Sequence, residues 1–241
     1  MAKLIAFMQG LSHGERVKFQ DYCLQEFAPR LLALDSSIQG LVVDLVDVVP
    51  AHMPAHMPWQ RPGELAPIPV DPPYDAAIEA WFETADQSRD AARWLVAELS
   101  GRCPRLDVFR TTEWIERDRP VPVVHGRSPG VKYISQCTFH GDLPDSTARR
   151  SWGLHVPLAL RVHVGVAKYV RNWVEEPLSP VTGKVQGIVE LHFDSIADLE
   201  QRWFDSECGR AEIIQDVGHF LKGAVRMFTT EHILRAWQCG G

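Results

Sequence analysis

Two stretches of this sequence follow one pattern: Ile78-Glu79-Ala80-Trp81-Phe82-Glu83-Thr84 and Val189-Glu190-Leu191-His192-Phe193-Asp194-Ser195. Each is rich in apolar, β-branched and aromatic residues, which is typical of a strand. Each ends at a Thr or Ser with an acidic neighbour, and these residue types favour the N-terminus of a helix. The pattern therefore predicts a strand followed at once by a helix, and amphipathic segments do follow at 85–99 and 196–207.

The segments around these two stretches also occur in a matching order. Each half of the chain opens with a short strand, continues through a helix and a β-branched run, and closes with a last strand. These segments are 3–7, a helix ending at 27–29, 41–49 and 106–114 in the first half, and 132–136, a helix ending at 155–157, 164–174 and 223–229 in the second. We predict an α+β protein of tandem ferredoxin-like (βαββαβ) repeats, whose two sheets cover each other, enclose one apolar pocket and carry their helices outside.

Proline-rich segments mark the connections in the chain. Prolines 120, 122 and 129 lie in 118–130, which we predict to be a linker between an N-terminal repeat, 1–117, and a C-terminal repeat, 131–241. Residues 50–73 are predicted to form a long loop, because their many prolines lack a backbone donor. This loop contains a doubled Ala-His-Met-Pro motif at 51–58 whose His and Met side chains could bind copper. No carboxylate or thiol completes a ligand set, so a lid or a subunit contact is the favoured interpretation.

The composition argues against several classes of function. The chain of 241 residues has a formal net charge of −6 and no cluster of Lys and Arg interleaved with aromatic residues, so we expect no nucleic-acid partner. No apolar run reaches the roughly 20 residues of a membrane-spanning helix, so we expect no membrane partner. The five cysteines lack C-x-x-C spacing, which argues against a disulfide framework or a structural zinc site and favours a cytoplasmic location. We find no glycine-rich phosphate loop, and we predict no metal and no cofactor.

The second half resembles the EthD-like family of dimeric α+β barrel proteins. Five segments carry the resemblance: Glu190-Leu191-His192-Phe193-Asp194-Ser195, Ser206-Glu207-Cys208-Gly209-Arg210-Ala211, Phe220-Leu221, Phe228-Thr229-Thr230-Glu231-His232 and His155-Val156-Pro157-Leu158-Ala159. The first half matches in outline only, with Phe27 where the family has a His. The resemblance implies an intramolecular version of this barrel, with the working pocket in the C-terminal repeat and a degenerate one in the N-terminal repeat. It does not imply one chemistry, because relatives include cyclases, cofactor-free monooxygenases and isomerases.

The two halves differ at positions suited to proton transfer. Phe27 and Trp81 in the first half correspond to His155 and His192 in the second. His155 follows Trp152 by three residues, so the two share a helix face, and the resemblance implies that this face lines the cavity. His192 alternates with Glu190 on one strand face, while the opposite face is wholly apolar and is predicted to pack on helices.

We therefore expect Glu190 and His192 to point into the cavity, where a carboxylate beside an imidazole would favour a general base. A buried Glu–His hydrogen bond that only orders the sheet is the alternative. The candidate catalytic residues are His155, His192, Tyr169 and Glu190. The candidate substrate-binding residues are Tyr133, Ser135, Trp152, Asn172, Trp203, Asp216, His219 and Phe220.

These residues suggest a cofactor-independent lyase, a decarboxylase or dehydratase, that acts on a small aromatic or phenolic acid by His-mediated proton transfer. Cofactor-free oxygenation, cyclisation or isomerisation of an aromatic substrate is an alternative, and so is a non-catalytic protein that binds a small molecule. The expected partner is a small aromatic substrate, and a homodimer is possible.

Overall fold

The computed structural model describes residues 1–11, 15–34, 36–50, 73–118, 126–181 and 183–237. The strands are β1 (Ala2–Gln9), β2 (Gly40–Leu45), β3 (Ala76–Phe82), β4 (Arg105–Asp118), β5 (Val131–Phe139), β6 (Val166–Pro177), β7 (Gly187–Phe193) and β8 (Leu221–Arg235). The helices are α1 (Arg16–Tyr22), the π-helical η2 (Cys23–Phe27), α2 (Ala28–Leu34), α3 (Ala85–Leu99), α4 (Asp145–Val162), α5 (Ile196–Gln201) and α6 (Glu207–Gly218). Residues 51–72 of the predicted loop and 119–125 of the predicted linker lie outside the described residues.

The strands of the described chain close into one antiparallel barrel in the order β1-β3-β2-β8-β5-β7-β6-β4. Each half of the chain contributes four neighbouring strands, in the orders β4-β1-β3-β2 and β8-β5-β7-β6. The two halves join where β2 pairs with β8 and where β4 pairs with β6. The molecule is therefore a mixed α+β protein with an eight-stranded barrel, and both halves have the same order of elements.

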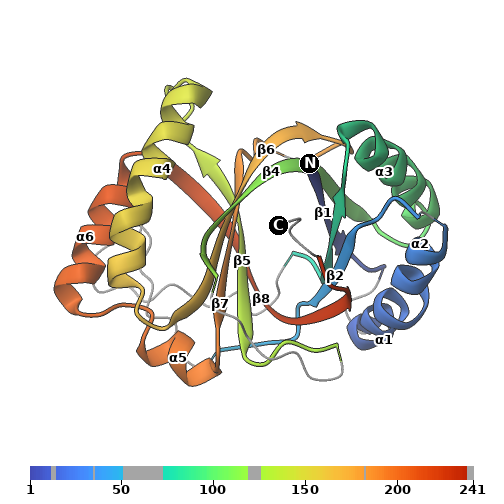
Figure 1. The fold of residues 1–241 in the computed structure, drawn as a ribbon, viewed down its shortest axis with the longest axis horizontal. Helices are drawn as coiled ribbons and strands as arrows, with labels where there is room; N and C mark the ends of the chain where they lie inside the picture. Colours follow the sequence, from blue (N-terminus) through green and yellow to red (C-terminus); the bar gives the residue numbers. More distant parts are fainter. Residues whose placement is uncertain (12–14, 35, 51–72, 119–125, 182, 238–241) are drawn as a thin grey trace.

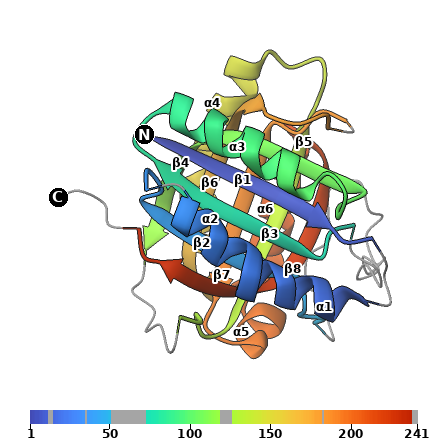
Figure 2. The same ribbon diagram turned by 90° about the vertical axis from the view of Figure 1, so that its right-hand side faces the viewer.

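The helices cover the outside of the barrel in two groups. Figure 1 shows α1, α2 and α3 on one side of the strands and α4, α5 and α6 on the opposite side, and Figure 2 shows the first group lying across its sheet. Because side chains alternate along a strand, each strand sends one set of residues under the helices and the other set into the barrel. On β1, Leu4 and Met8 pack with the helix layer, whereas Ile5 and Phe7 pack inside the barrel.

The strand–helix junctions that the sequence predicted have side-chain caps. Thr84 forms a capping box with Gln87 at the start of α3, and the Ser195 hydroxyl accepts a hydrogen bond from the Asp198 amide at the start of α5. The helix predicted over 196–207 is wrong in its extent: α5 ends at Gln201, and a separate α6, capped by Ser206, was not predicted. None of the described helices is long and apolar enough to cross a bilayer.

Other boundaries also differ from the prediction, among them the end of α4 and the end of β2. Helix α4 continues through Pro157 to Val162, although the sequence suggested an end near the proline. The proline removes one backbone donor, but the helix remains packed on the sheet through buried residues on both sides of it. Strand β2 stops at Leu45, short of the predicted 41–49, and a backbone contact from Val48 to Phe228 continues the chain beside β8.

The barrel interior contains a buried ring of charges that links the two halves. Lys3 Nζ lies 2.5 Å from Glu79 Oε2 and 2.7 Å from Glu190 Oε1, and Lys132 Nζ bonds the same two carboxylates from the other side. Burial alone would lower the pKa of Lys132, but the surrounding carboxylates raise it well above its usual value. Both lysines are therefore charged, and the ring holds the N-terminal and C-terminal sheets together.

The strand pairing of the N-terminal half is repeated in the C-terminal half, so each residue of one sheet can be matched with a residue of the other. Lys3 lies opposite Trp81 on one neighbouring strand, and Lys132 lies opposite His192 on the corresponding one. Other facing pairs along these strands match in the same way, such as Ala6 opposite Val108 and Ser135 opposite Arg226. This correspondence allows the helix-covered face of one half to be compared directly with that of the other.

Candidate active site

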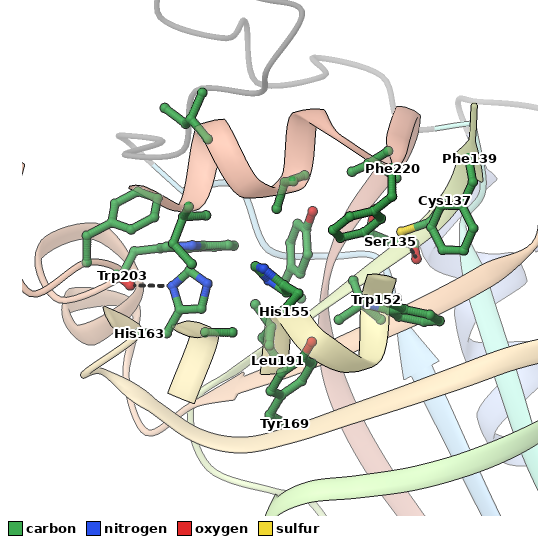
Figure 3. Close-up of a pocket in the computed structure, with 18 residues that line it drawn as sticks. Ser135, Cys137, Phe139, Trp152, His155, His163, Tyr169, Leu191, Trp203 and Phe220 are labelled. Atoms are coloured by element: carbon green, nitrogen blue, oxygen red, sulfur yellow. Dashed lines mark hydrogen bonds between the residues drawn. The ribbon is translucent and has the colours of Figure 1, made fainter. Parts of the chain in front are cut away.

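A cavity of about 100 Å³ lies under the helices of the C-terminal half, on the outer face of its sheet. Figure 3 shows its lining residues, which come from β5, β6, β7, α4, the segment after α5, α6 and the start of β8. They are Tyr133, Ser135, Cys137, Phe139, Trp152, His155, Ala159, His163, Tyr169, Val189, Leu191, Trp203, Phe204, Ile213, Ile214, Val217, Phe220 and Leu221. The prediction that two sheets enclose the pocket is wrong: one sheet and its helices enclose it.

His155 is the imidazole that faces this cavity from α4. Its side chain is buried, and Nδ1 lies 2.7 Å from Asp216 Oδ2 on α6. Because a carboxylate only accepts hydrogen bonds, Nδ1 carries the proton and Nε2 is the basic nitrogen. Burial lowers the pKa of His155, and the Asp216 carboxylate opposes this shift. His155 is thus a neutral imidazole at neutral pH, held in one tautomer by an acid behind it.

Aromatic rings form most of the cavity wall. Trp203 meets Tyr133 edge-on at a centroid distance of 5.0 Å, and Phe220 meets the His155 ring at 5.7 Å. Trp152 contacts Phe139 at 5.5 Å and lies against β7 at Gly187, where a Cβ atom would come within 2.6 Å of the indole. Such a lining suits a planar apolar ligand.

A few polar groups interrupt this wall. The Ser135 hydroxyl is buried and makes no hydrogen bond with any described residue. Burial raises the pKa of Cys137 to about 12, so its thiol stays protonated. Burial also raises the pKa of Tyr169 and that of Tyr133, so both remain phenols that can donate a hydrogen bond.

His163 has a different position from His155. It caps the C-terminal end of α4, and its Nδ1 donates to the Trp203 carbonyl at 2.8 Å. Burial lowers its pKa to about 4, so it is neutral across the physiological range. This hydrogen bond fixes the segment that carries Trp203, and we infer that His163 shapes the cavity.

The same sheet face in the N-terminal half contains no polar group at the matching positions. The register matches Tyr133, Ser135, Cys137, Tyr169 and Arg226 with Leu4, Ala6, Met8, Leu41 and Val108. The N-terminal residues are all at most 1% exposed and pack as ordinary core. Phe27, which corresponds to His155, is fully buried and stacks on Trp94. The fold therefore does not require the polar groups of the C-terminal face.

Three predicted site residues lie on the other side of the sheet. Glu190, His192 and Asn172 point into the barrel, where Asn172 Nδ2 donates to Glu190 Oε1 at 2.6 Å. The expectation that His192 and Glu190 share a cavity with His155 is wrong. The alternation of the strand was interpreted correctly, but the apolar face lines the cavity and the polar face joins the buried ion ring. A ligand beside His155 is therefore separated from His192 by the sheet.

Of the remaining predicted residues, most line the cavity and two do not. Tyr133, Ser135, Trp152, Trp203, Phe220 and Tyr169 line the cavity with His155. Asp216 lies behind His155 as its hydrogen-bond partner and does not line the cavity, and His219 is exposed at the end of α6. Sequence reasoning missed His163 and Cys137. Cys137 could have been predicted to line the cavity, because it continues the alternation of Tyr133 and Ser135 along the same strand.

One group of carboxylates inside the barrel has the spacing of a metal site. Oxygens of Asp44, Glu79 and Glu231 lie within 4.8 Å of one another. Lys132 Nζ lies 3.1 Å from both Asp44 Oδ2 and Glu231 Oε2 and also bonds Glu79. The ammonium group occupies the position that a cation would need, so these residues do not fit a metal ion in this arrangement.

The closed barrel with its outer helix layers is a fold that this chain shares with solved structures. A candidate monooxygenase from Fusobacterium nucleatum subsp. nucleatum aligns over 100% of this chain and 95% of its own, with a TM-score of 0.56 and 8% identity. An anthrone oxidase-like protein aligns over 97% and 91%, with a TM-score of 0.61 and 10% identity. A chlorite dismutase variant from Candidatus Nitrospira defluvii, solved with cyanide, aligns over 95% and 90%, with a TM-score of 0.52 and 10% identity.

These similarities show the fold and not the chemistry, because the sequence identities are so low. No protein-family model matches the chain. No curated protein matches it either.

Proposed function

We propose that this chain is an enzyme that removes a proton from a small aromatic substrate, with His155 as the general base. The observation that carries the proposal is the pairing of His155 with Asp216 at the wall of an apolar cavity. An unprotonated imidazole nitrogen beside the ligand is what proton abstraction requires, and the carboxylate behind it stabilises the imidazolium that forms. Apolar walls strengthen these interactions, because little water competes.

The size of the cavity supports a substrate with a single ring. An apolar cavity of about 150 Å³ in an engineered protein is large enough for benzene. The cavity beside His155 has about 100 Å³, which one six-membered ring with small movements of the walls would fill. Trp152, Trp203 and Phe220 would contact the faces and edges of such a ring.

The reaction class that we favour is a lyase. His155 Nε2 would take a proton from a substrate carbon, and the electron pair of that C–H bond would form a double bond as a hydroxyl group leaves the adjacent carbon. The imidazolium would return its proton to the leaving oxygen, which departs as water. Decarboxylation is the related possibility, in which His155 takes the phenolic proton of the substrate, and the imidazolium so formed protonates the ring carbon that then loses carbon dioxide and leaves a phenolate. Neither reaction requires an electron acceptor.

Oxygenation is the second candidate. It is favoured by the similarity of the whole chain to proteins described as a monooxygenase and as anthrone oxidase-like. In that reaction the carbanion formed by His155 would react with dioxygen, which accepts its electrons. The proton abstraction is the same first step in both candidates.

We also propose a finer description of the fold, a tandem duplication of one ferredoxin-like unit with EthD-like character in its C-terminal half. The matching register of the two halves supports the duplication. The His155 segment supports the EthD-like resemblance, because it lies at the cavity as that resemblance implies.

Mass spectrometry of reaction mixtures tests the proposed function. The purified protein would be incubated in air with a panel of single-ring hydroxy acids and no added cofactor. Loss of water or of carbon dioxide indicates a lyase, and gain of oxygen indicates an oxygenase. Chromatography would detect isomerisation, which leaves the mass unchanged. Binding without any of these chemical changes would contradict the proposal that the protein is an enzyme and would favour a binding protein.

Variants at two histidines, His155 and His192, locate the base. His155→Gln, and His155→Phe, which introduces the residue of the other half, should lower kcat by about 10² to 10⁴. His192→Gln should retain turnover within a few-fold, because His192 lies across the sheet from the cavity. Activity that survives in the His155 variants and disappears in His192→Gln would refute the assignment.

A further inference from the structure

Arg226 is a cation on the cavity-facing side of the sheet. It lies on β8 directly opposite Ser135 of β5, and cross-strand neighbours have Cβ atoms about 4.5–5.5 Å apart. Residues two positions away on each strand, Phe228 and Tyr133, also pack on this face. Arg226 does not itself line the cavity, but Ser135 does. A ligand group that contacts the Ser135 hydroxyl would therefore lie within reach of the guanidinium.

The guanidinium has no partner of opposite charge within the described part of the chain. Its Nε is buried and makes no hydrogen bond. The other arginine of this face, Arg171, is in a different state, because Glu116 accepts hydrogen bonds from its Nε and Nη2. A half-buried cation without a counter-ion is costly for a folded protein, since part of its hydration is lost and nothing replaces it.

The positive charge of Arg226 affects two residues of the cavity wall, Tyr133 and Cys137. Burial raises the pKa of Tyr133 and that of Cys137, and in both cases the Ser135 side chain and the Arg226 guanidinium act in the opposite direction. Next to it, the buried Ser135 hydroxyl also makes no hydrogen bond with a described residue. Two hydrogen-bond donors, Ser135 on the cavity wall and Arg226 beside it, thus lie next to each other at one end of a mostly apolar cavity.

The N-terminal half shows that the fold does not need this pair. Ala6 and Val108 occupy the corresponding positions and are fully buried core residues. Within the described residues, the polar pair is present only in the half that has His155 and the cavity beside it. This restriction indicates a role toward a ligand.

We propose that Arg226 and Ser135 form a carboxylate-binding subsite, so that the substrate is an aromatic acid held by its carboxylate at one end of the cavity. The inference rests on the proposed function and specifies its substrate class. A guanidinium matches a carboxylate with two parallel hydrogen bonds, and the Ser135 hydroxyl adds a third donor. Figure 3 shows Ser135 and His155 at separate positions along the cavity, so the ring would lie between them.

This arrangement makes the carboxylate a recognition group. Paired with Arg226, it is stabilised in its ionised ground state and would resist loss as carbon dioxide. Among the reactions considered above, loss of water or oxygenation keeps the carboxylate in the product. The subsite therefore favours those reactions over decarboxylation.

Calorimetric titration with two matched probes tests the subsite. 4-Hydroxybenzoate and 4-hydroxybenzamide have nearly the same shape, and only the first is an anion. The wild-type protein should bind the acid at least about tenfold more tightly than the amide, as expected for hydrogen bonds to a charged group. Arg226→Gln and Ser135→Ala should weaken binding of the acid and leave that of the amide within about twofold, and Arg226→Lys should retain part of the preference.

A matched control comes from the same strand. Lys222→Gln removes one positive charge from an exposed position of β8 and should leave both affinities unchanged. His155→Gln should still prefer the acid even though it has lost turnover, which separates this inference from the proposed catalysis. Equal affinity of the wild-type protein for the two probes would overturn the subsite alone. Binding of neither probe would contradict both the subsite and the proposed single-ring ligand.

Discussion

The chemical character of His155 depends on a single hydrogen bond. Its Nδ1 donates to Asp216, whose side chain is 41% exposed, while the imidazole itself is buried. Burial disfavours the imidazolium, and Asp216 partly restores its stability. The balance leaves a base that is unprotonated at neutral pH and can still accept a proton from substrate.

Asp216→Asn is expected to shift the pH profile of the reaction. Without the carboxylate, the pKa of His155 falls further below its usual value, because the opposing effect of Asp216 is lost. The acidic limb of kcat/KM, where activity declines as His155 becomes protonated, should therefore move to lower pH, and kcat should fall at least about tenfold because the base is weaker. Steady-state kinetics from pH 4 to 9 would measure both effects.

Glu212→Gln provides the control for that experiment. It makes the same change of charge one turn earlier on α6, where Glu212 pairs with Arg161 and not with His155. Its pH profile should match the wild type. A profile of Asp216→Asn that is unchanged, or shifted to higher pH, would show that Asp216 does not support the base.

Single residues also show where sequence reasoning succeeded and failed. The contrast between His155 and Phe27 is visible in the sequence, and it identified the half that contains the cavity. The cavity side of β7 could not be decided in the same way, because both faces of a helix-covered barrel strand are buried. We predicted that Glu190 and His192 line the pocket, because polar side chains are expected where a protein binds a ligand. Glu190 instead bonds two buried lysines that lie far away in the sequence, and His192 lies beside Glu190 inside the barrel.

At the scale of elements, the cavity depends on how closely α4 lies on β7. Gly187 has no side chain beneath the Trp152 ring, and an added Cβ would also meet Phe139 at 3.2 Å. The sequence predicts β7 and α4, but not this contact, because the spacing of two packed elements depends on side chains from both. The sequence did not predict helix α6, because its buried face contains only Gly209 and Ile213 and so produces a weak apolar pattern.

Gly187→Ala should therefore damage both packing and binding. The methyl group displaces Trp152 from the wall, and overpacking of this kind costs about 1–3 kcal/mol of unfolding free energy. Binding of 4-hydroxybenzoate should weaken in parallel. Urea unfolding and calorimetry would measure the two quantities.

Gly153→Ala on α4 is the matched control. Nothing lies within 4 Å of a Cβ at this position, and alanine is the better helix former by roughly 0.5–1 kcal/mol. It should stabilise the protein slightly and leave binding unchanged. If Gly187→Ala behaved like Gly153→Ala, the close contact between Trp152 and β7 would not limit the cavity.

At the scale of the whole molecule, the two halves are connected by charge as well as by strand pairing. Lys3 and Lys132 each bond both Glu79 and Glu190, so each lysine contacts a carboxylate of its own half and one of the other. The matching order of elements in the two halves could be predicted from the sequence, since the order of segments repeats. The ring could not, because four residues at distant positions meet only when the barrel closes.

Lys132→Met is expected to destabilise the protein severely. It leaves buried carboxylates without their cation, and breaking such a buried pair costs about 3–5 kcal/mol. Urea unfolding should still show a single transition, because the ring joins both halves, and its midpoint should be lower than that of the wild type. Lys18→Met, which removes an exposed lysine paired with Glu15, should leave the midpoint unchanged. Equal midpoints for the two variants would show that the ring contributes nothing to stability.

A crystal structure of the protein with 4-hydroxybenzoate tests the central claim most directly. The ring should lie on the outer face of the C-terminal sheet between Trp152 and Trp203, with a ring substituent or ring edge at His155 Nε2 and the carboxylate at Ser135 and Arg226. A ligand inside the barrel beside His192, or under the helices of the N-terminal half, would contradict the proposed site.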